Sequence, residues 1–392
     1  MFNFDEIIDR KDNFSVKWSE MDINFGSNDL LPMWVADMDF KVAPAILESL
    51  KNRLEQGIYG YTTRPESYND AIKGWLEKRF QWSINKNWLL FSPGVIPIIS
   101  LAIDSLTKEG DKIMIQQPVY SPFSSVVRNN DRELVVSPLK KLENGDYVMD
   151  YENIENNIKN VKMFLLCNPH NPVGRVWSKE ELEKLGQICL KHNVIVISDE
   201  IHSDIIFKNH KHTPFASISD ELSNITITCM SPSKTFNIAG LQCSYAITSN
   251  EEYLYALNKA FTRIDIKRNN AFSLVATEAA YKNCENWLDQ LLIYLESNAN
   301  FVVDYINKNI PEVSVKKPEG TYLMWLDFSK LNKTDLEIKK ALLNIGKVAL
   351  NYGPSFGIGG EGFHRLNIAC PRLMLRDALS RIEKAVNYLK EN

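Results

Sequence analysis

Apolar residues in the middle of the chain gather in short runs that are mostly unbroken. Such runs occupy residues 87–92, 112–116, 162–168, 193–198, 225–230 and 243–248. Strands of a parallel sheet have this pattern when helices cover both faces of the sheet. Helical periodicity at 95–106 and 178–192 separates some of the runs, and helical patterns at 43–56 and 66–80 precede them. This alternation predicts an α/β domain with a mainly parallel sheet.

The pattern changes near residue 275, where a long region with a 3.6-residue period begins and continues to 308. Strand-like runs at 321–328 and 363–370 follow, and an amphipathic helix at 376–390 closes the chain. These elements predict a second, smaller α+β domain. The N-terminal residues precede the sheet and need a partner, so we expect them to pack with this small domain. The predicted division is an N-terminal segment at 1–50, a large domain at 51–285 and a small domain at 286–392.

The composition excludes several classes of protein. Of the 392 residues, 44% are hydrophobic and 24% charged, and the net charge of −4 with no basic face argues against a nucleic-acid partner. No apolar run approaches the roughly 20 residues that span a bilayer, so no membrane partner is expected. The first twenty residues lack the apolar core of a signal peptide. Six cysteines without C-x-x-C spacing indicate reduced thiols, and we expect a cytoplasmic protein.

Polar residues directly follow five of the predicted strands. In open α/β sheets, ligands bind beyond the carboxyl ends of the strands, so these residues are candidates for a site. They are Gly94 in "SPGVIP", Tyr120 in "QPVYSP", Asn171 in "NPHNPVGR", Asp199 and His202 in "SDEIH", and Ser231, Ser233 and Lys234 in "SPSK". Gly94 also precedes the helix predicted at 95–106, and the free N–H groups of a helix N-terminus attract anions.

Lys234 needs a chemical use, because burying a lysine amine costs several kcal/mol unless something neutralises or consumes its charge. Pyridoxal 5′-phosphate would use the whole set of residues. Its phosphate fits the helix N-terminus, its aldehyde forms a Schiff base with a lysine, and a carboxylate keeps its ring nitrogen protonated. The residues therefore predict this cofactor, with Lys234 as its attachment point.

Seven longer sequence motifs follow one another between residues 34 and 372. They are "WVADMDF", "YGYT", "SPGVIP", "NPHNPVGRVW", "SDEIHSD", "SPSKTFNIAGL" and "RLNIACPR". In this order they resemble the fold-type I pyridoxal-phosphate enzymes of the class I/II aminotransferase superfamily. More narrowly, the chain is similar to the MalY/PatB-type cystathionine β-lyases. The resemblance implies a large domain with a mainly parallel sheet flanked by helices, and a smaller α+β domain.

The resemblance also implies roles around the cofactor. Lys234 would be the Schiff-base lysine and would move the proton. Asp199 would pair with the ring nitrogen, Asn171 would bond the phenolic oxygen, and Tyr120 would stack on the ring. The implied phosphate ligands are the amides of Gly94 and Val95 and the hydroxyls of Ser231 and Ser233.

Three further residues receive roles from the same resemblance. Tyr61 would reach the phosphate of the neighbouring subunit and take part in catalysis there, so a homodimer with a shared active site is expected. Arg365 would grip the α-carboxylate of a small amino-acid substrate, for which its bidentate fork is suited. Asp37 and Asn171 would be additional substrate contacts.

Several of these residues have ordinary structural alternatives. His202 stands where aminotransferases usually carry a tyrosine, and histidine is usual there in the lyase-like branch, but it could equally be a satisfied, half-buried histidine. Asp199 could be a helix N-cap, and Tyr120 could be plain packing. Gln242 stands where some aminotransferases keep an arginine for the phosphate, so the phosphate would depend more on the helix N-terminus.

Two other motifs give no site. "GIGGEG" at 357–362 fits G-x-G-x-x-G, but it runs into the strand predicted at 363–370 instead of opening a helix. "NHKH" at 209–212 has two histidines without further ligands, so no metal site is expected.

The expected activity is β-cleavage of a carbon–sulfur bond in cystathionine or related cysteine S-conjugates, which yields a thiol, pyruvate and ammonia. Two alternatives remain open. An aminotransferase would use the same residues and differ in where the proton returns. A protein that sequesters a transcription regulator, with lyase activity secondary, would need a surface patch that the sequence does not reveal.

Overall fold

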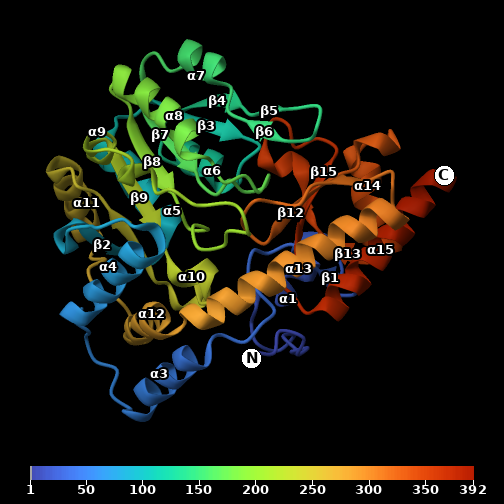
Figure 1. Cartoon of the computed structure of the whole chain (residues 1–392), viewed down its shortest axis with the longest axis horizontal. Coiled ribbons are helices and arrows are strands. Elements are labelled where there is room, and N and C mark those ends of the chain that lie inside the picture. Colours follow the sequence, from blue (N-terminus) through green and yellow to red (C-terminus); the bar gives the residue numbers. More distant parts are fainter. Residues whose placement is uncertain (1) are drawn as a thin grey trace.

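The computed structural model describes residues 2–392, and its largest sheet has seven strands in the order β2-β10-β9-β8-β7-β3-β4 (Figure 1). Their bounds are β2 Leu89–Ser92, β3 Lys112–Gln117, β4 Glu133–Pro138, β7 Val161–Cys167, β8 Ile195–Asp199, β9 Thr226–Met230 and β10 Ser244–Ile247. The pairs β3–β4, β3–β7, β7–β8 and β8–β9 are parallel. The prediction of a mainly parallel α/β sheet is confirmed.

Strand β10 corrects the prediction in one respect, because it runs antiparallel to both β9 and β2. The interpretation of 243–248 as a parallel strand is therefore wrong. An apolar run indicates that both faces of a strand are buried, but it does not indicate whether the strand is parallel or antiparallel to its neighbours. The chain returns from β9 through the short helix α10, Pro232–Thr235, instead of crossing over a face of the sheet.

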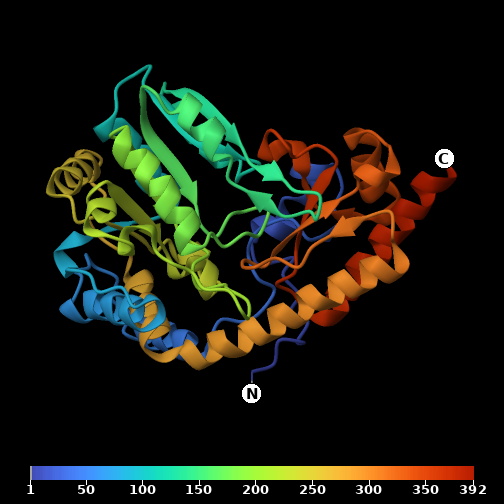
Figure 2. The same ribbon diagram turned by 45° about the horizontal axis from the view of Figure 1, so that its top comes forward.

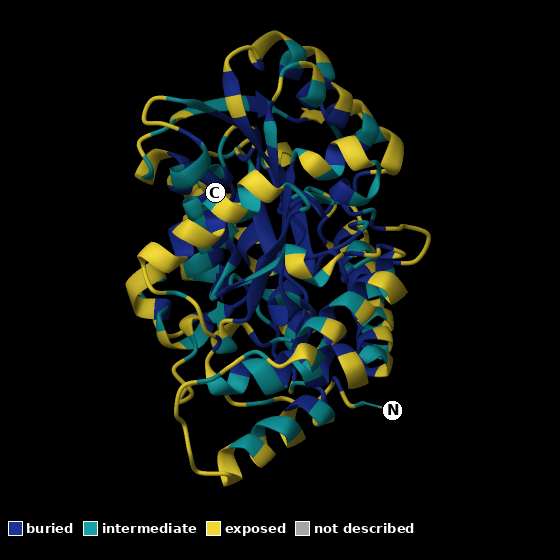
Figure 3. Ribbon diagram, turned by 90° about the vertical axis from the view of Figure 1, so that its left-hand side faces the viewer, coloured by how far each residue is buried: buried dark blue, intermediate teal, exposed yellow. Residues whose placement is uncertain are grey.

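Alternate side chains of the strands enter different cores, as the two-residue period of a strand requires. On β7, Met163 and Leu165 pack in one apolar cluster, and Phe164 and Leu166 pack in another. Helices α5 Val95–Leu106, α6 Pro122–Asn129 and α11 Glu251–Arg263 contribute to the first cluster, and α7 Tyr151–Asn157, α8 Lys179–Lys191 and α9 Asp220–Asn224 to the second. Figure 3 shows the central strands buried and exposed positions on the outer helices.

A second, antiparallel sheet lies in the C-terminal part, in the order β11-β12-β15-β14. Its strands are β11 Ser314–Val315, β12 Leu323–Asp327, β14 Asn351–Tyr352 and β15 Phe363–Asn367, with α14 Asp335–Ala341 and α15 Arg372–Glu391 beside them. The long helix α13, Glu285–Asn309, extends along both parts of the molecule (Figure 2). The motif at 357–362 leads into β15 instead of opening a helix, as the sequence predicted.

Helix predictions hold where the apolar period is strong. Those at 43–56, 66–80, 95–106, 178–192 and 376–390 correspond to α3 Pro44–Glu55, α4 Glu66–Phe80, α5, α8 and α15. Helix α8 begins with a capping box between Ser178 and Glu181, which explains its sharp start. The helix predicted at 275–308 is instead two helices, α12 Ala271–Asn283 and α13, which meet at Cys284 without a proline or glycine to signal the break.

The N-terminal segment contacts both parts of the molecule. Helices α1 Val16–Ser19 and α2 Met21–Phe25 lead to β1 Leu31–Pro32, which pairs with β13 Val348–Ala349 in the C-terminal part. Helix α3 packs instead against α12. The exact division into domains stays a prediction. No helix within residues 2–392 is long and apolar enough to cross a membrane.

Candidate active site

A cavity of about 400 Å³ lies at the carboxyl ends of the parallel strands, where such sheets bind ligands. The segments after β2, β3, β7, β8 and β9 line it, together with residues 34–36 and two positions of the C-terminal sheet. Nine predicted site residues meet there: Gly94, Val95, Tyr120, Asn171, Asp199, His202, Ser233, Lys234 and Arg365. Parallel strands end at one edge of a sheet, so motifs far apart in the sequence converge.

Lys234 enters this cavity from α10, directly after β9. Its Nζ donates a hydrogen bond to Ala36 O at 2.7 Å and forms no ion pair with a described carboxylate. The pKa of the Lys234 amine is lowered to about 8: burial and the charge of Arg365 lower it, and Asp37 and Asp199 partly oppose them. A substantial fraction of the amine is therefore neutral near pH 8, as a nucleophile or base must be.

Asp199 ends β8 and is 5% exposed. One carboxylate oxygen accepts a hydrogen bond from Ile201 N at 3.1 Å, and among residues 2–392 no cation pairs with the carboxylate. Burial raises the pKa of Asp199 to about 7, with Glu200 acting in the same direction. Asp199 is not a helix N-cap, because a turn and not a helix follows it. The hydrogen bond from Ile201 N occupies only one of its two oxygens. A buried carboxylate without a cation fits a ligand with a positively charged ring nitrogen.

The anion end of the cavity is the start of α5. Gly94 is the N-cap, and the first-turn N–H groups of Val95 and Ile96 have no partner within the helix. A Cβ at Gly94 would lie 3.2 Å from Cδ of Pro97, which is a tight contact. Ser233 lines the same cavity. Together these groups fit a phosphate.

The cavity wall contains Tyr120, Asn171 and His202. The Asn171 main chain accepts a hydrogen bond from Tyr120 N at 3.1 Å, which ties the two residues together. His202 is buried, its Nδ1 has no partner among the described residues, and burial lowers the pKa of its imidazole to about 3. The alternative of a satisfied, half-buried histidine is therefore wrong. A neutral ring with a free nitrogen fits a polar ligand atom.

Arg365 lies on β15 and is 4% exposed, yet no carboxylate of residues 2–392 pairs with it. Its Nη1 donates to Asn171 Oδ1 at 2.9 Å, and its Nη2 donates to Trp34 O at 2.8 Å and to Asn351 Oδ1. Nε has no hydrogen-bond partner among the described residues. The Arg365 Cζ lies 5.1 Å from the centroid of the Phe356 ring. Burial lowers the pKa of the guanidinium to about 10. A buried cation of this kind fits the carboxylate of a substrate.

Comparison with known proteins agrees with this geometry. Residues 20–382 match the family of aminotransferases, class I and II. The chain belongs to that family. It is 45% identical to cystathionine beta-lyase PatB of Bacillus subtilis (strain 168), over 98% of this chain and 100% of the relative. A PLP-bound protein from Clostridium difficile 630 that is described as an aminotransferase is 66% identical with a TM-score of 0.98, covering 99% of this chain and 100% of that one. Cystalysin from Treponema denticola, which contains pyridoxal 5′-phosphate, is 36% identical with a TM-score of 0.96 over both whole chains.

Three of the predicted site residues do not line the cavity. The Ser231 hydroxyl donates to Cys243 O at 2.7 Å and accepts from Ser233 N at the start of α10, and its role as a phosphate ligand stays a prediction. Asp37 is hydrogen-bonded by Arg10 at 2.8 Å, which leaves it tied to the N-terminal segment rather than free for a substrate. Tyr61 is 99% exposed in the loop between α3 and α4.

The prediction also missed residues that the structure brings to the cavity. Asn351 on β14 lines it and orients Arg365 through its side-chain oxygen. Trp34 and Ala36 act through backbone carbonyls, which no sequence motif reveals. The motif "WVADMDF" indicated that this segment belongs to the site, but the prediction assigned the contact to the Asp37 side chain and not to the main chain.

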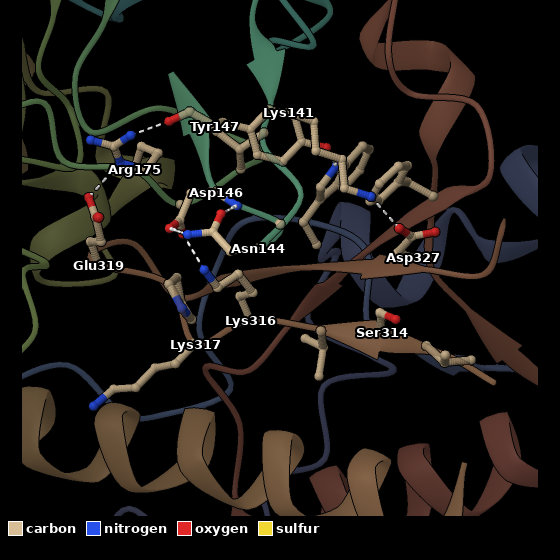
Figure 4. Close-up of a pocket in the computed structure, with 18 of the residues that line it drawn as sticks. Lys141, Asn144, Asp146, Tyr147, Arg175, Ser314, Lys316, Lys317, Glu319 and Asp327 are labelled. Atoms are coloured by element: carbon tan, nitrogen blue, oxygen red, sulfur yellow. Dashed lines mark hydrogen bonds and ion pairs between the residues drawn. The ribbon is translucent and has the colours of Figure 1, made fainter. Parts of the chain in front are cut away.

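A second cavity, of about 700 Å³, lies between the hairpin of β5 Lys140–Lys141 and β6 Tyr147–Val148 and the C-terminal sheet (Figure 4). Its lining charges pair with one another: Lys316 with Asp146, Lys141 with Asp327, and Arg175 with Glu319 at 2.9 Å. Because these charges balance locally, this cavity lacks the unpaired buried groups that mark the first one. No metal-binding cluster of His, Cys, Asp or Glu occurs in the described chain.

Proposed function

We propose that the chain is a pyridoxal 5′-phosphate-dependent carbon–sulfur β-lyase that cleaves cystathionine or related cysteine S-conjugates to a thiol, pyruvate and ammonia. The observation that carries it is a set of three ionisable groups around one cavity, none of which forms an ion pair with a described residue. Lys234 supplies the amine, Asp199 the carboxylate for the ring nitrogen, and Arg365 the receptor for the substrate carboxylate.

The curated relatives favour a lyase over the aminotransferase alternative, whereas the 66% identical structure from Clostridium difficile 630 is described as an aminotransferase. The relative with 45% identity is a cystathionine beta-lyase, and the match covers nearly the whole of both chains. His202 agrees with this assignment, since tyrosine usually occupies its position in aminotransferases.

The residues of the cavity divide the reaction among themselves. The bound cofactor supplies an electron sink for the charge left at the substrate Cα. Arg365 binds the α-carboxylate and turns the Cα–H bond toward Lys234. Lys234 accepts that proton, because burial keeps its amine from holding its own proton tightly. The thiolate then leaves from Cβ, and water converts the remaining fragment to pyruvate and ammonia.

The decisive experiment supplies cystathionine to the purified enzyme without any keto acid. We expect pyruvate, ammonia and homocysteine to be released over many turnovers, because β-elimination restores the starting enzyme and needs no second substrate. Lactate dehydrogenase with NADH measures the pyruvate continuously. A wild-type reaction with added keto acid is the control.

The aminotransferase alternative predicts a different time course. Transamination transfers the amino group to the cofactor, so product formation stops after one equivalent until a keto acid accepts that group. A single stoichiometric burst that keto acid rescues would contradict the lyase proposal.

The active enzyme is proposed to be a cytoplasmic homodimer. Apolar side chains are exposed around the loop that carries Tyr61: Ile58 is 76% exposed and Tyr59 is 51% exposed. Burial of this surface against a second copy would bring Tyr61 to the phosphate of the other subunit. All six cysteines are free and buried, which agrees with a reducing compartment.

Complementation tests the shared site. The variants Tyr61→Phe and Lys234→Ala are each expected to be impaired as homodimers, but a heterodimer of the two contains one site with both native residues. Activity per heterodimer should then recover to about half that of the wild type, since one of two sites is intact. Differently tagged chains allow the heterodimer to be isolated before assay. No recovery in a verified heterodimer would contradict the shared site.

A further inference from the structure

Four charges lie just outside the cavity, and we call them the N-terminal clamp: Lys17 and Asp39, which are buried, and Arg10 and Asp37, which are partly buried. Lys17 is fully buried, with Nζ 2.5 Å from Asp39 Oδ2 and 3.7 Å from Asp37 Oδ1. Arg10 donates to Asp39 Oδ1 at 2.6 Å and to the two oxygens of Asp37 at 2.8 and 3.2 Å. Two cations balance two carboxylates, and this pairing offsets part of the cost of removing the charges from water.

The backbone of residues 34–39 connects the clamp to the cavity. Ala36 O accepts the hydrogen bond from Lys234 Nζ at 2.7 Å, and Trp34 O accepts one from Arg365 Nη2 at 2.8 Å. One short stretch of main chain therefore holds both cations of the cavity, and the clamp carboxylates extend from its other end. A change in the clamp reaches both cations.

The clamp also sets part of the electrostatic field at Lys234. Asp37 raises the pKa of the Lys234 amine, and Arg10 and Lys17 offset the charge of Asp37. The other titratable groups around Lys234 are Asp199, His202, Arg365, Tyr120, Tyr322, Cys167 and Cys243. Unlike these groups, Asp37 is paired with Arg10 and Lys17, so these two residues of the N-terminal segment affect its charge.

We propose that Arg10 and Lys17 are positioning residues for the reaction. By neutralising Asp37 and Asp39, they hold residues 34–39 against the two cavity cations and keep an unbalanced negative charge away from the reacting amine. Neither residue lines the cavity. The inference rests on the proposed function, in which the Lys234 nitrogen gives up and takes a proton.

The test variant is Arg10→Met, because the Arg10 side chain is 13% exposed and its loss is less disruptive than that of the fully buried Lys17. In the full-length holoenzyme, the pH midpoint of the cofactor's visible absorbance is expected to rise by about half a pH unit. The sign follows because a less balanced Asp37 favours the protonated Lys234 nitrogen. In the substrate complex the same charge favours the protonated Lys234 amine, so kcat on the acid side of its pH profile should fall about threefold. Arg10→Gln gives the same expectation if Arg10→Met does not fold.

Three matched variants separate positioning from general stability. Arg10→Lys keeps the charge and should restore most of the midpoint. The double variant Arg10→Met with Asp37→Asn removes the matching carboxylate and should return the midpoint to the wild-type value. Lys41→Met removes an exposed ion pair with Glu6 from the same region and should change neither the midpoint nor kcat. The thermal unfolding midpoint is measured for every variant.

The outcomes are distinguishable. A lower thermal midpoint in Arg10→Met with an unchanged pH midpoint would show that the clamp is only structural and would overturn the proposal. A shift that persists in the double variant would overturn it as well, because the effect would not act through Asp37. If the wild type binds cofactor but shows no lyase turnover, the proposed function fails, and the absorbance titration still decides on the clamp.

Discussion

Replacement of Lys234 by alanine is expected to lower kcat by about 10³-fold or more and to remove the covalent attachment of the cofactor. The amine has two tasks, attachment and proton transfer, and no other lysine lines the cavity within the described chain. Steady-state pyruvate release measures the first effect. Borohydride reduction followed by peptide mass mapping measures the second, because reduction fixes the cofactor to its lysine.

The wild type and a surface variant provide the controls for this experiment. The wild-type protein should be yellow, and its reduced form should yield one modified peptide containing Lys234. Lys140→Ala removes a lysine that is 54% exposed and pairs with Asp150 at the surface, and it should leave both readings unchanged. A modified wild-type peptide that lacks Lys234 would show that the site assignment is wrong.

Arg365→Ala is expected to raise KM about 30- to 1000-fold and to leave the cofactor bound. Loss of a charge-assisted pair with the substrate carboxylate costs roughly 2–4 kcal/mol, and each 1.4 kcal/mol corresponds to about tenfold. The side chain is already buried without a counter-ion, so its unpaired state is the resting state of the site. Initial rates over a wide range of substrate concentration measure the effect, and visible absorbance reports the cofactor.

Arg365→Lys is the matched control for charge without the planar fork. It should recover part of the loss, because a single ammonium contacts one carboxylate oxygen at a time. Truncation of Arg365 also leaves Asn171, Asn351 and Trp34 without a donor, so the thermal unfolding midpoint must be recorded for both variants. Loss of the cofactor absorbance in Arg365→Ala would indicate that this arginine is structural.

The tertiary structure changes the meaning of one motif in particular. The sequence suggested that Asp37 contacts the substrate, but the structure pairs it with Arg10 and Lys17. The same motif contributes to the cavity through the carbonyls of Trp34 and Ala36. The motif is therefore proposed to act through main-chain carbonyls that hold Lys234 and Arg365, and not through a carboxylate that binds substrate.

Local chemistry explains which elements the sequence could predict. Helices such as α5 and α8 were predicted almost to the residue, because a 3.6-residue period and a capping box are properties of neighbouring residues. The direction of β10 and the break at Cys284 were not, because neither leaves a local mark. An apolar strand looks the same in either direction when both of its faces are buried.

The sequence by itself determined the fold class and predicted most of the residues that line the cavity. Polar residues after parallel strands must meet at one edge of the sheet, so Asp199 and Lys234 could be assigned to one site without coordinates. Only the tertiary structure decided the partners of those residues. Whether a carboxylate such as Asp37 is free or paired, and whether the Ser231 hydroxyl has a proton to give, depends on groups distant in sequence. Whether a charge is paired depends on its neighbours in three dimensions, and burial without an opposite charge is what distinguishes Arg365 and Asp199 from the many ion-paired groups of the described chain.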